Sequence, residues 1–350
     1  MRKKVALLGG SFDPVHNGHI AMANEAIQKL GADEVWFIPA AQSPLKHRVL
    51  THALDRLAML RIVCKDNPKF RICDIELKRN GISYTIDTLK TLNERFPDID
   101  FVWLLGADQA AQFDQWKDAD QLVRLAQFAV ADRDDRLEKE GIPQGFIRLP
   151  MEPVDVSSSQ IREGRRLNLM PEAVRQYILD HELYLVFWIK PQMDPARFAH
   201  SNSVARLCRE LARAHGYDEH KAWLTGLFHD IAKDLDKAEQ QKWIEACFPE
   251  AINEHQAIWH GYVGSEVVDR VYGIHDPMIR NAICNHVKGT SYDPYAMMVY
   301  VSDKLDPLRG YDSSGLYNTC LHDLYNGFLL VKAENKAFLE KEQKRKNGSI

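Results

Sequence analysis

Two histidines near the start of the sequence have the spacing and surroundings of a phosphate-binding site. His16 and His19 are three residues apart and follow a short apolar run that ends in Gly9 and Gly10. We expect a helix to begin at Gly18, where unpaired backbone N–H groups and a partial positive charge favour a bound phosphate. Two imidazoles at that place can donate hydrogen bonds to a phosphoryl group and stabilise charge that develops on an α-phosphate. The clustering disfavours the alternative interpretation, a glycine turn with two incidental histidines.

A second group of residues, in the C-terminal half, has the side chains of a metal site. The six candidate ligands fall on or beside expected helices: His200, His229, Asp230, His260, His286 and Asp303. Imidazole nitrogens and carboxylates suit iron, manganese or zinc, and a shared carboxylate can bridge two ions. Two ions about 3.5–4 Å apart can activate a water molecule and hold a phosphoryl group in line. Histidines on helix surfaces are the alternative, and a second pair, His275-Asp276, shows that the His-Asp dipeptide alone carries little information.

The segments that must position the first group alternate between strand-like and helix-like patterns. Strands are expected over residues 4–8, 35–38, 70–77, 101–105 and 128–131, and helices over 19–30, 54–63 and 86–96. Such alternation predicts an α/β fold, a doubly wound parallel sheet with helices on both faces. The ligand site of such a sheet lies at the carboxyl ends of its strands, and both histidines follow the end of the first strand.

The character of the sequence changes after Glu182. An apolar and aromatic stretch over residues 183–189 is followed by a polar segment that contains Pro191 and Pro195. Beyond it helical patterns dominate, over residues 205–214, 222–233, 238–246, 264–271 and 278–285. We therefore expect two domains, residues 1–189 and 190–350, of which the second is all-α.

Composition narrows the class of protein. A chain of 350 residues is long enough for two domains, and its net charge of −4 argues against general binding to nucleic acid or to an anionic membrane. The six cysteines are scattered without a CxxC pair, which fits a reducing cytosol better than a disulfide framework. The apolar run after the N-terminal charges is too short for a signal peptide, and no segment has the roughly 18 apolar residues of a membrane span. We expect a cytoplasmic protein. The sequence is compatible with either a monomer or an oligomer.

Residues 1–185 resemble the nucleotidyltransferase superfamily with its Rossmann-like fold, and within it the bacterial nicotinate-nucleotide adenylyltransferases. Five blocks carry the resemblance in order: the His-x-Gly-His segment from Gly9 to Ile20, Pro39 with Ser43-Pro44-Leu45-Lys46, Ile82-Ser83-Tyr84-Thr85, Gly106-Ala107-Asp108 with Trp116, and Ser157-Ser158-Ser159-Gln160-Ile161-Arg162. Ser159 stands where threonine is commoner. Arg133-Asp134-Asp135 departs from the usual Arg-Pro-Gly.

The resemblance implies a role for each matching position. His16 and His19 would hold the ATP phosphates and the transition state, and Lys46 and Arg162 would add positive charge over the triphosphate. Asp108 would bind the ATP ribose, while Thr85 and Trp116 would frame a pyridine ring. Alternatively, Trp116 is a core aromatic and Thr85 caps a helix. Further positions are implied at the nucleotide, namely Gly9, Gly10, Ser11, Phe12, Gly106, Ser158, Ser159 and Ile161, and at the mononucleotide, namely Lys46, Tyr84 and Arg133.

The implied reaction is attack by the phosphate of nicotinate mononucleotide on the α-phosphorus of ATP. It releases pyrophosphate and forms deamido-NAD, a step in NAD biosynthesis. Positioning and charge neutralisation, with Mg²⁺ on the ATP, supply the catalysis, and no nucleophilic side chain is required. Rival acceptors are nicotinamide mononucleotide, pantetheine phosphate and glycerol phosphate. A nucleotide-binding regulatory module without turnover is the alternative from another class, and the intact His16, His19, Lys46 and Arg162 disfavour it.

Residues 195–335 resemble HD-domain phosphohydrolases, and most closely the YqeK-like branch, which hydrolyses diadenosine tetraphosphate symmetrically to ADP. The matching segments are His229-Asp230-Ile231-Ala232-Lys233, His260-Gly261-Tyr262-Val263-Gly264, Asn285-His286-Val287-Lys288-Gly289 and Ser302-Asp303-Lys304-Leu305-Asp306-Pro307. By resemblance, Asp230 would bridge two metal ions, expected to be iron. His200, His229 and Asp303 would complete one site, His260 and His286 the other. Lys233 would neutralise a phosphate of the substrate. The alternative interpretation is a solvent-exposed lysine without a role in the site.

Two departures from that branch concern the choice of substrate. Gly261-Tyr262 stands where alanine and proline usually follow the third histidine, and Val287-Lys288-Gly289 stands where a Thr-Thr-Gly run usually follows the fourth. A general nucleotide phosphatase and a non-catalytic metal-bound sensor are the alternatives for this half.

Overall fold

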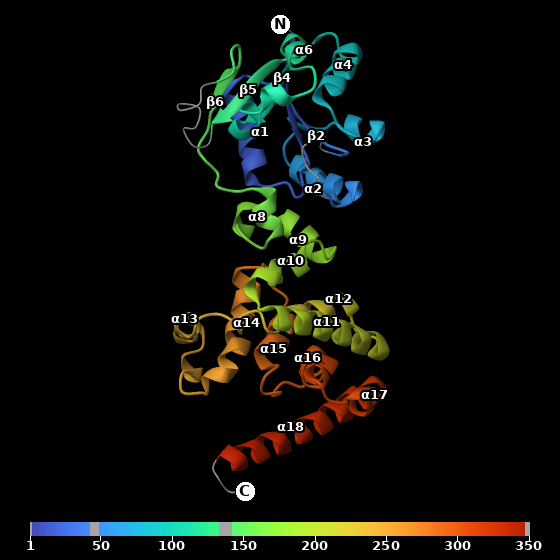
Figure 1. The fold of residues 1–350 in the computed structure, drawn as a ribbon, viewed down its shortest axis with the longest axis vertical. Coiled ribbons are helices and arrows are strands. Elements are labelled where there is room, and N and C mark those ends of the chain that lie inside the picture. Colours follow the sequence, from blue (N-terminus) through green and yellow to red (C-terminus); the bar gives the residue numbers. More distant parts are fainter. Residues whose placement is uncertain (1, 43–48, 133–141, 347–350) are drawn as a thin grey trace. The chain divides into compact units, whose positions relative to one another are not determined.

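The computed structural model describes residues 2–42, 49–132 and 142–346 (Figure 1). The chain divides into two compact units, Met1–Tyr177 and Ile178–Ile350. The domain boundary expected after residue 189 lies inside the second unit and stays a prediction. No helix in the described ranges is both long and apolar enough to cross a membrane.

The first unit is built on a six-stranded sheet in the order β3-β2-β1-β4-β5-β6, with every neighbouring pair parallel. The strands are β1 (Lys3–Gly10), β2 (Glu34–Pro39), β3 (Phe70–Ile72), β4 (Ile99–Gly106), β5 (Gln127–Asp132) and β6 (Ile147–Pro150). The strand order reverses between β1 and β4, whose register pairs Leu7 with Trp103. A ligand crevice is expected at this switch point, beyond the carboxyl ends of the two strands.

Helices connect these strands and cover the sheet. The helical segments are α1 (Asn17–Lys29), α2 (Ala53–Lys65), α3 (Ile75–Arg79), α4 (Thr85–Arg95), α5 (Ala107–Ala110), η1 (Phe113–Gln115), α6 (Ala119–Leu125), α8 (Ser158–Arg162) and η2 (Leu167–Leu169). The boundary between the two units falls within the next helix, α9 (Glu172–Asp180). Val5 and Leu7 of β1 share one core cluster with Leu89 of α4 and Leu122 of α6. Ala6 between them is also fully buried. Successive side chains of a strand point to opposite faces, so β1 is covered on both, as expected of a doubly wound sheet.

Two of the expected elements differ from the structure. The strand expected over residues 70–77 ends at Ile72, and α3 follows from Ile75, so the prediction is wrong for its second half. Apolar alternation over so few residues does not separate a strand from the first turn of a helix. No strand was expected at β6, where only Leu149 of four residues is buried. An edge strand with little buried surface leaves a weak pattern in the sequence.

The described residues of the second unit form helices and the turns between them, without a strand. The helices are α10 (Leu185–Ile189), η3 (Lys190–Gln192), α11 (Pro195–His215), α12 (Glu219–Phe228), α13 (Lys237–Cys247), η4 (Pro249–Ala251), η5 (Gln256–Ile258), α14 (Trp259–Arg270), α15 (Pro277–Asn285), α16 (Pro294–Leu305), η6 (Pro307–Arg309), α17 (Ser314–His322) and α18 (Leu324–Lys346). The core of this unit is formed around α16, whose residues 295–303 are all buried. A helix that is apolar on every side is a core helix, and it carries Asp303 into the interior.

Candidate functional site

The first site begins where β1 ends and α1 starts. His16 is the N-cap residue of α1, and His19 lies in the first turn of that helix. The backbone N–H of His16 donates a hydrogen bond to Nδ1 of His19 across 3.2 Å. A ring nitrogen that accepts a hydrogen bond carries no proton, so the proton of neutral His19 is on Nε2. The ring of His19 can therefore donate from Nε2 to a phosphate oxygen.

The two imidazoles are held close together. Their ring centroids are 3.7 Å apart, and the edge of Phe12 packs on His19 at 5.0 Å. A Cβ at Gly18 would lie 3.1 Å from the His16 ring, so a larger residue would have to displace this histidine.

Arg162 reaches the same place from the far end of the first unit. Helix α8 begins at the N-cap Ser157, and its Ser158 hydroxyl donates to the carbonyl of Pro14 at 2.9 Å. Arg162 donates from Nη1 to the carbonyl of Asp13 at 2.5 Å and from Nη2 to the Ser159 hydroxyl at 2.9 Å. These bonds tie α8 to the loop that precedes His16, about 145 residues earlier in the chain.

A cavity of about 580 Å³ collects most of the residues expected at the nucleotide. Its lining includes Gly9, Gly10, Ser11, His16, His19, Gly106, Asp108, Ser158, Ser159 and Arg162. Phe12 and Ile161 are also in the expected set, but they are fully buried and do not line the cavity. The structure thus brings residues from β1, α1, β4, α5 and α8 to one crevice at the switch point of the sheet.

A second cavity, of about 330 Å³, adjoins the first. The two share Gly9, Gly10, Ser11, Asp108 and Gln109. Three residues expected at the mononucleotide, Tyr84, Thr85 and Trp116, line the second cavity. Trp116 also packs against Phe113, with 5.7 Å between ring centroids, so part of its ring belongs to the core. Lys46 and Arg133, the remaining expected positions, lie outside the described residues.

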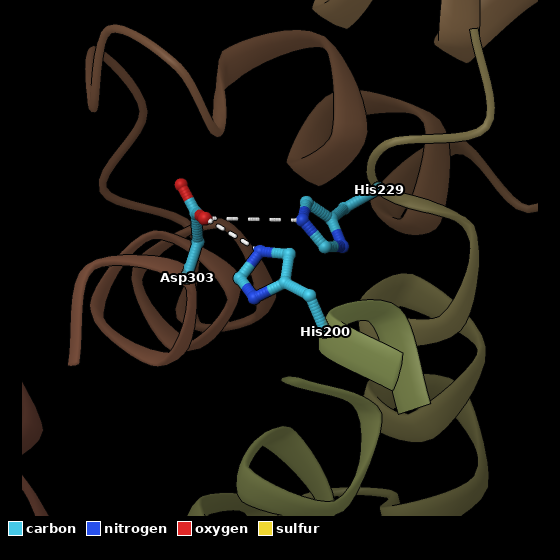
Figure 2. A group of neighbouring side chains, drawn as sticks. All are labelled: His200, His229 and Asp303. Carbon is cyan, nitrogen blue, oxygen red and sulfur yellow. Dashed lines mark hydrogen bonds and ion pairs between the residues drawn. The ribbon is translucent and has the colours of Figure 1, made fainter. Parts of the chain in front are cut away.

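The second site is a cluster of histidines and aspartates inside the second unit. Figure 2 shows His200, His229 and Asp303 converging from α11, the end of α12 and α16. His200 Nε2 is 3.1 Å from Asp303 Oδ1, and His229 Nε2 is 3.9 Å from the same oxygen. These three residues form one group that could hold a metal ion, and His229, Asp230 and His286 form another.

Asp230 lies at the centre of this cluster. Its Oδ1 is 3.3 Å from Nε2 of His260 and 3.4 Å from Nε2 of His286, while its Oδ2 is 3.6 Å from Nε2 of His229. All six expected ligands therefore meet at one place, with the Asp230 carboxylate between the others. Burial alone would disfavour its charge, but the basic side chains around it, the ammonium of Lys233 among them, hold the pKa of Asp230 well below its ordinary value.

The tautomers of two histidines test whether this cluster fits a metal ion. Nδ1 of His229 lies 2.8 Å from the carbonyl of Gly226, and Nδ1 of His286 lies 2.6 Å from the carbonyl of Ile283. A carbonyl only accepts, so Nδ1 carries a proton in each ring, and Nε2 presents a lone pair when the ring is neutral. Burial lowers the pKa of His229 to about 3, which keeps this ring neutral. The Nε2 atoms of His229 and His286 both lie near the carboxylate of Asp230. Lone pairs and a carboxylate are all acceptors, so a metal cation between them would bind to each.

Cationic side chains also contact these carboxylates. Arg197 and Lys233 contact Asp230 Oδ2 at 3.3 and 3.0 Å. Lys304 contacts Asp303 Oδ2 at 2.6 Å, and Arg309 is hydrogen-bonded to the same carboxylate. The cluster therefore attracts positive charge from several elements, as an anionic metal site does. Lys233 lies beside Asp230, where a substrate phosphate on the metal could reach it.

Comparison with known proteins agrees with these two sites. A cytidylyltransferase-like family model matches residues 7–164, and an HD-domain model matches residues 197–308. A Mycoplasma pneumoniae protein named "Probable nicotinate-nucleotide adenylyltransferase/Ap4A hydrolase" is 30% identical over 309 residues, 87% of this chain and 88% of that protein. Its Mycoplasma genitalium counterpart, of the same name, is 30% identical over 315 residues, 88% of this chain and 89% of that protein. The chain belongs to the nicotinate-nucleotide adenylyltransferase/Ap4A hydrolase family.

Each half of this two-part family corresponds to one site. Every described residue of the first site lies within 7–164, and all six expected metal ligands lie within 197–308. A Herpetosiphon aurantiacus protein named "Probable nicotinate-nucleotide adenylyltransferase" is 38% identical over 196 residues, which cover 52% of this chain and 99% of that protein. The first part of the family thus also resembles proteins of about half this length.

Several site residues were not expected from the sequence. Glu76 and Lys117 line the second cavity of the first unit, and Asp306 contacts the metal cluster. Asp306 Oδ2 lies 2.5 Å from His200 Nδ1, and Ser203 donates to Asp306 Oδ1 at 2.7 Å, so this buried carboxylate orients His200. In the sequence, Asp306 could have been found because it lies three residues after Asp303. Lys117 could have been found because it directly follows Trp116, whereas nothing in the sequence alone points to Glu76.

Proposed function

We propose that the first unit transfers AMP from ATP to nicotinate mononucleotide, which gives deamido-NAD and pyrophosphate. The observation that carries this proposal is the convergence of His16, His19 and Arg162 on one cavity that opens into a second cavity lined by Trp116. The first cavity has donors for the triphosphate, and the second has an aromatic ring for the pyridine. The names of the relatives support this choice of substrates over other phosphate acceptors.

In this reaction the protein acts by placing donors around the phosphate that is attacked. His19 can donate from Nε2, and hydrogen bonds to the carbonyl of Asp13 and the hydroxyl of Ser159 hold the cationic guanidinium of Arg162 in place. Charge that develops on the α-phosphate oxygens is met by donors already in place, so little reorganisation is needed. Mg²⁺ carried by ATP would neutralise the triphosphate and make pyrophosphate a better leaving group.

The second unit is proposed to hydrolyse diadenosine tetraphosphate to ADP. His200, His229 and Asp303 would hold one metal ion, His260 and His286 a second, and Asp230 would lie between the two. Two transition-metal ions, expected to be iron, would supply an activated water and a clamp for the phosphate. Lys233 would neutralise a phosphate oxygen, and Asp306 would keep His200 in the orientation that ligation requires.

Assays of the purified full-length protein test both proposals separately. ATP with nicotinate mononucleotide should give pyrophosphate and deamido-NAD, and nicotinamide mononucleotide should be the poorer acceptor. Diadenosine tetraphosphate should give two molecules of ADP, and metal analysis should find up to two transition-metal ions per chain. ATP and AMP as products, in place of ADP, would contradict the symmetrical hydrolysis.

A further inference from the structure

A third cavity, of about 750 Å³, lies beside the metal cluster in the second unit. Its lining includes His260 and Lys233 from the cluster and continues along α13 and the segment before α14. Lys237, Gln240, His255 and Gln256 are among the other lining residues. The cavity is therefore placed to receive the part of a substrate that extends beyond a phosphate held at the metal ions.

The described side chains of this cavity favour an anionic ligand. Lys233 and Lys237 are cationic, and Glu254 is the acidic residue of the lining. Nδ1 of His255 accepts a hydrogen bond from the backbone N–H of Ala257 at 3.1 Å. The proton of the neutral His255 ring is therefore on Nε2, which can donate to a phosphate oxygen.

The charge of Glu254 is neutralised by a residue outside the lining. Lys288 donates to both carboxylate oxygens of Glu254, at 2.9 and 3.0 Å. Tyr262 donates its hydroxyl to Glu254 Oε2 at 3.1 Å and accepts from Lys288 at 3.1 Å. Glu254, Tyr262 and Lys288 thus form a closed cluster, which we call the loop lock. Within the described cavity lining, the one carboxylate is thus already paired, and Lys237 and His255 do not have to compete with it for an anionic ligand.

The loop lock fixes the segment between α13 and α14, residues 248–258. The ring of Phe248 packs on Tyr262 at 5.3 Å between centroids, and the indole N–H of Trp259 donates to the carbonyl of Ala251 at 3.1 Å. Lys288 then holds Glu254, the residue before His255. Contacts at three points along the segment reduce its freedom, so His255 is positioned before a ligand binds.

The loop lock also explains the two departures from the YqeK-like pattern. Tyr262 is two residues after His260, and Lys288 is two residues after His286. The unusual residues occur in two separate segments, yet their side chains meet on the same carboxylate. Two departures that contact each other indicate a joint role in this chain, at the edge of the substrate cavity.

We propose that Lys237 and His255 bind the phosphates of a dinucleoside polyphosphate beyond the metal-bound one, and that the loop lock positions His255 for this contact. This inference rests on the proposed hydrolase function. A long substrate should depend on the cavity, whereas bis(p-nitrophenyl) phosphate, with a single phosphate, should depend on the metal cluster alone. The ratio of kcat/KM for diadenosine tetraphosphate to kcat/KM for bis(p-nitrophenyl) phosphate therefore measures the contribution of the cavity.

Variants of the metal-loaded, full-length protein test the contact residues. His255→Ala and Lys237→Ala should each lower the ratio roughly tenfold, mainly through KM for the tetraphosphate, since each loses a charge-assisted hydrogen bond. Lys242→Ala is the matched control, because Lys242 is an exposed lysine of the same helix outside the cavity lining. It should leave the ratio unchanged.

The loop lock has its own test. Lys288→Met should lower the ratio by increasing KM, and Lys288→Arg should restore it, because arginine can also pair with Glu254. Metal content and the thermal midpoint show whether a variant is folded and loaded. Wild-type protein with no activity on diadenosine tetraphosphate would overturn the proposed function and this inference together. Wild-type activity with an unchanged ratio in His255→Ala, Lys237→Ala and Lys288→Met would overturn only the inference.

Discussion

The backbone N–H of His16 donates to Nδ1 of His19, and this one bond decides which nitrogen of His19 can face a substrate. Because Nδ1 is used as an acceptor, the proton of the neutral ring is on Nε2. The bond joins the N-cap residue of α1 to the first turn of the same helix, so the helix that supplies a phosphate site also orients one of its donors.

Alanine at either histidine should lower kcat more than it raises KM for ATP. The donors are proposed to meet charge that grows as the α-phosphate is attacked, so their loss affects the transition state more than the bound substrate. Removal of one such donor should reduce kcat by roughly 10²–10³-fold. Steady-state kinetics of His16→Ala and His19→Ala with varied ATP would measure this, and near-normal turnover of both would show that the site is assigned wrongly.

Substitution of His19 by glutamine or by asparagine distinguishes the roles of its two ring nitrogens. The side chain of glutamine can place an N–H where Nε2 lies, whereas that of asparagine can replace only the acceptor at Nδ1. His19→Gln should therefore retain more turnover than His19→Asn. The reverse order would mean that the bond to the His16 N–H, and not donation from Nε2, is what the reaction needs.

Trp116→Ala should weaken binding of the mononucleotide much more than that of ATP. Trp116 lines the smaller cavity, whereas the cavity that holds His16 and His19 does not include it. Loss of an aromatic stacking partner removes about 0.5–1.5 kcal/mol beyond the loss of buried area. KM values for the two substrates, measured on the same protein, test this prediction.

Trp116→Phe provides the matched control for that experiment. Phenylalanine keeps an aromatic face toward the cavity and the contact with Phe113, so it should retain most of the affinity for the mononucleotide. Equal losses for both substrates in Trp116→Ala would instead assign this residue to the core, the alternative that the sequence left open.

Glu76 gives the first unit a stability that depends on pH. Burial raises the pKa of Glu76 above its ordinary value, although Thr88 donates a hydrogen bond to it at 2.7 Å. A carboxyl with a raised pKa in the folded state stabilises the fold at pH values below the unfolded pKa, and this contribution is lost as pH rises through the folded pKa. Glu76→Gln keeps the acceptor for Thr88 and removes the ionisation.

Calorimetry of the full-length protein between pH 4.5 and 8.5 measures this effect. The Glu76→Gln transition should coincide with that of the wild type at the acid end and exceed it by a few degrees at the alkaline end. Glu94→Gln, an exposed glutamate on α4, should follow the wild type at every pH. A Glu76→Gln protein less stable than the wild type at pH 8.5 would contradict the prediction.

The parts of the fold that the sequence predicts are those with a local cause. β1 is apolar on both faces because it is central in the sheet, so a short apolar run before Gly9 and Gly10 identifies it. His16 and His19 are close in sequence as well as in space, and a motif of a few residues contains both. The six metal ligands were predicted through their order along the chain, which resembles a known family.

The parts that the sequence does not predict depend on distant contacts. Glu76 lies in the cavity only because β3 ends at Ile72 and α3 begins at Ile75, where the sequence pattern predicts a continued strand. Asp306 is an orienting residue only because His200, 106 residues away, packs against it. The loop lock likewise joins Glu254 to Lys288 across 34 residues, a pairing without any sequence period.

The two activities should be separable by single substitutions. The described residues of the transferase site lie before residue 163, and the expected metal ligands lie after residue 199. Asp230 is close to three histidine nitrogens, so Asp230→Ala should unseat both metal ions and abolish hydrolysis of diadenosine tetraphosphate. The same variant should still make deamido-NAD, because the transferase needs only Mg²⁺ bound to ATP. Conversely, His19→Ala should lower dinucleotide synthesis by roughly 10²–10³-fold and leave the hydrolysis intact.

Metal content and folding decide how the Asp230 result is understood. Wild type should carry up to two transition-metal ions per chain, and Asp230→Ala far fewer, whereas Glu340→Ala, at an exposed acid of α18, should match wild type. Asp230→Asn preserves the volume of the buried side chain and separates loss of charge from loss of packing. A folded Asp230→Asn protein that has lost both activities would show that the halves share a site or depend on each other. Independent loss, one activity for each variant, is the outcome expected of two enzymes in one chain.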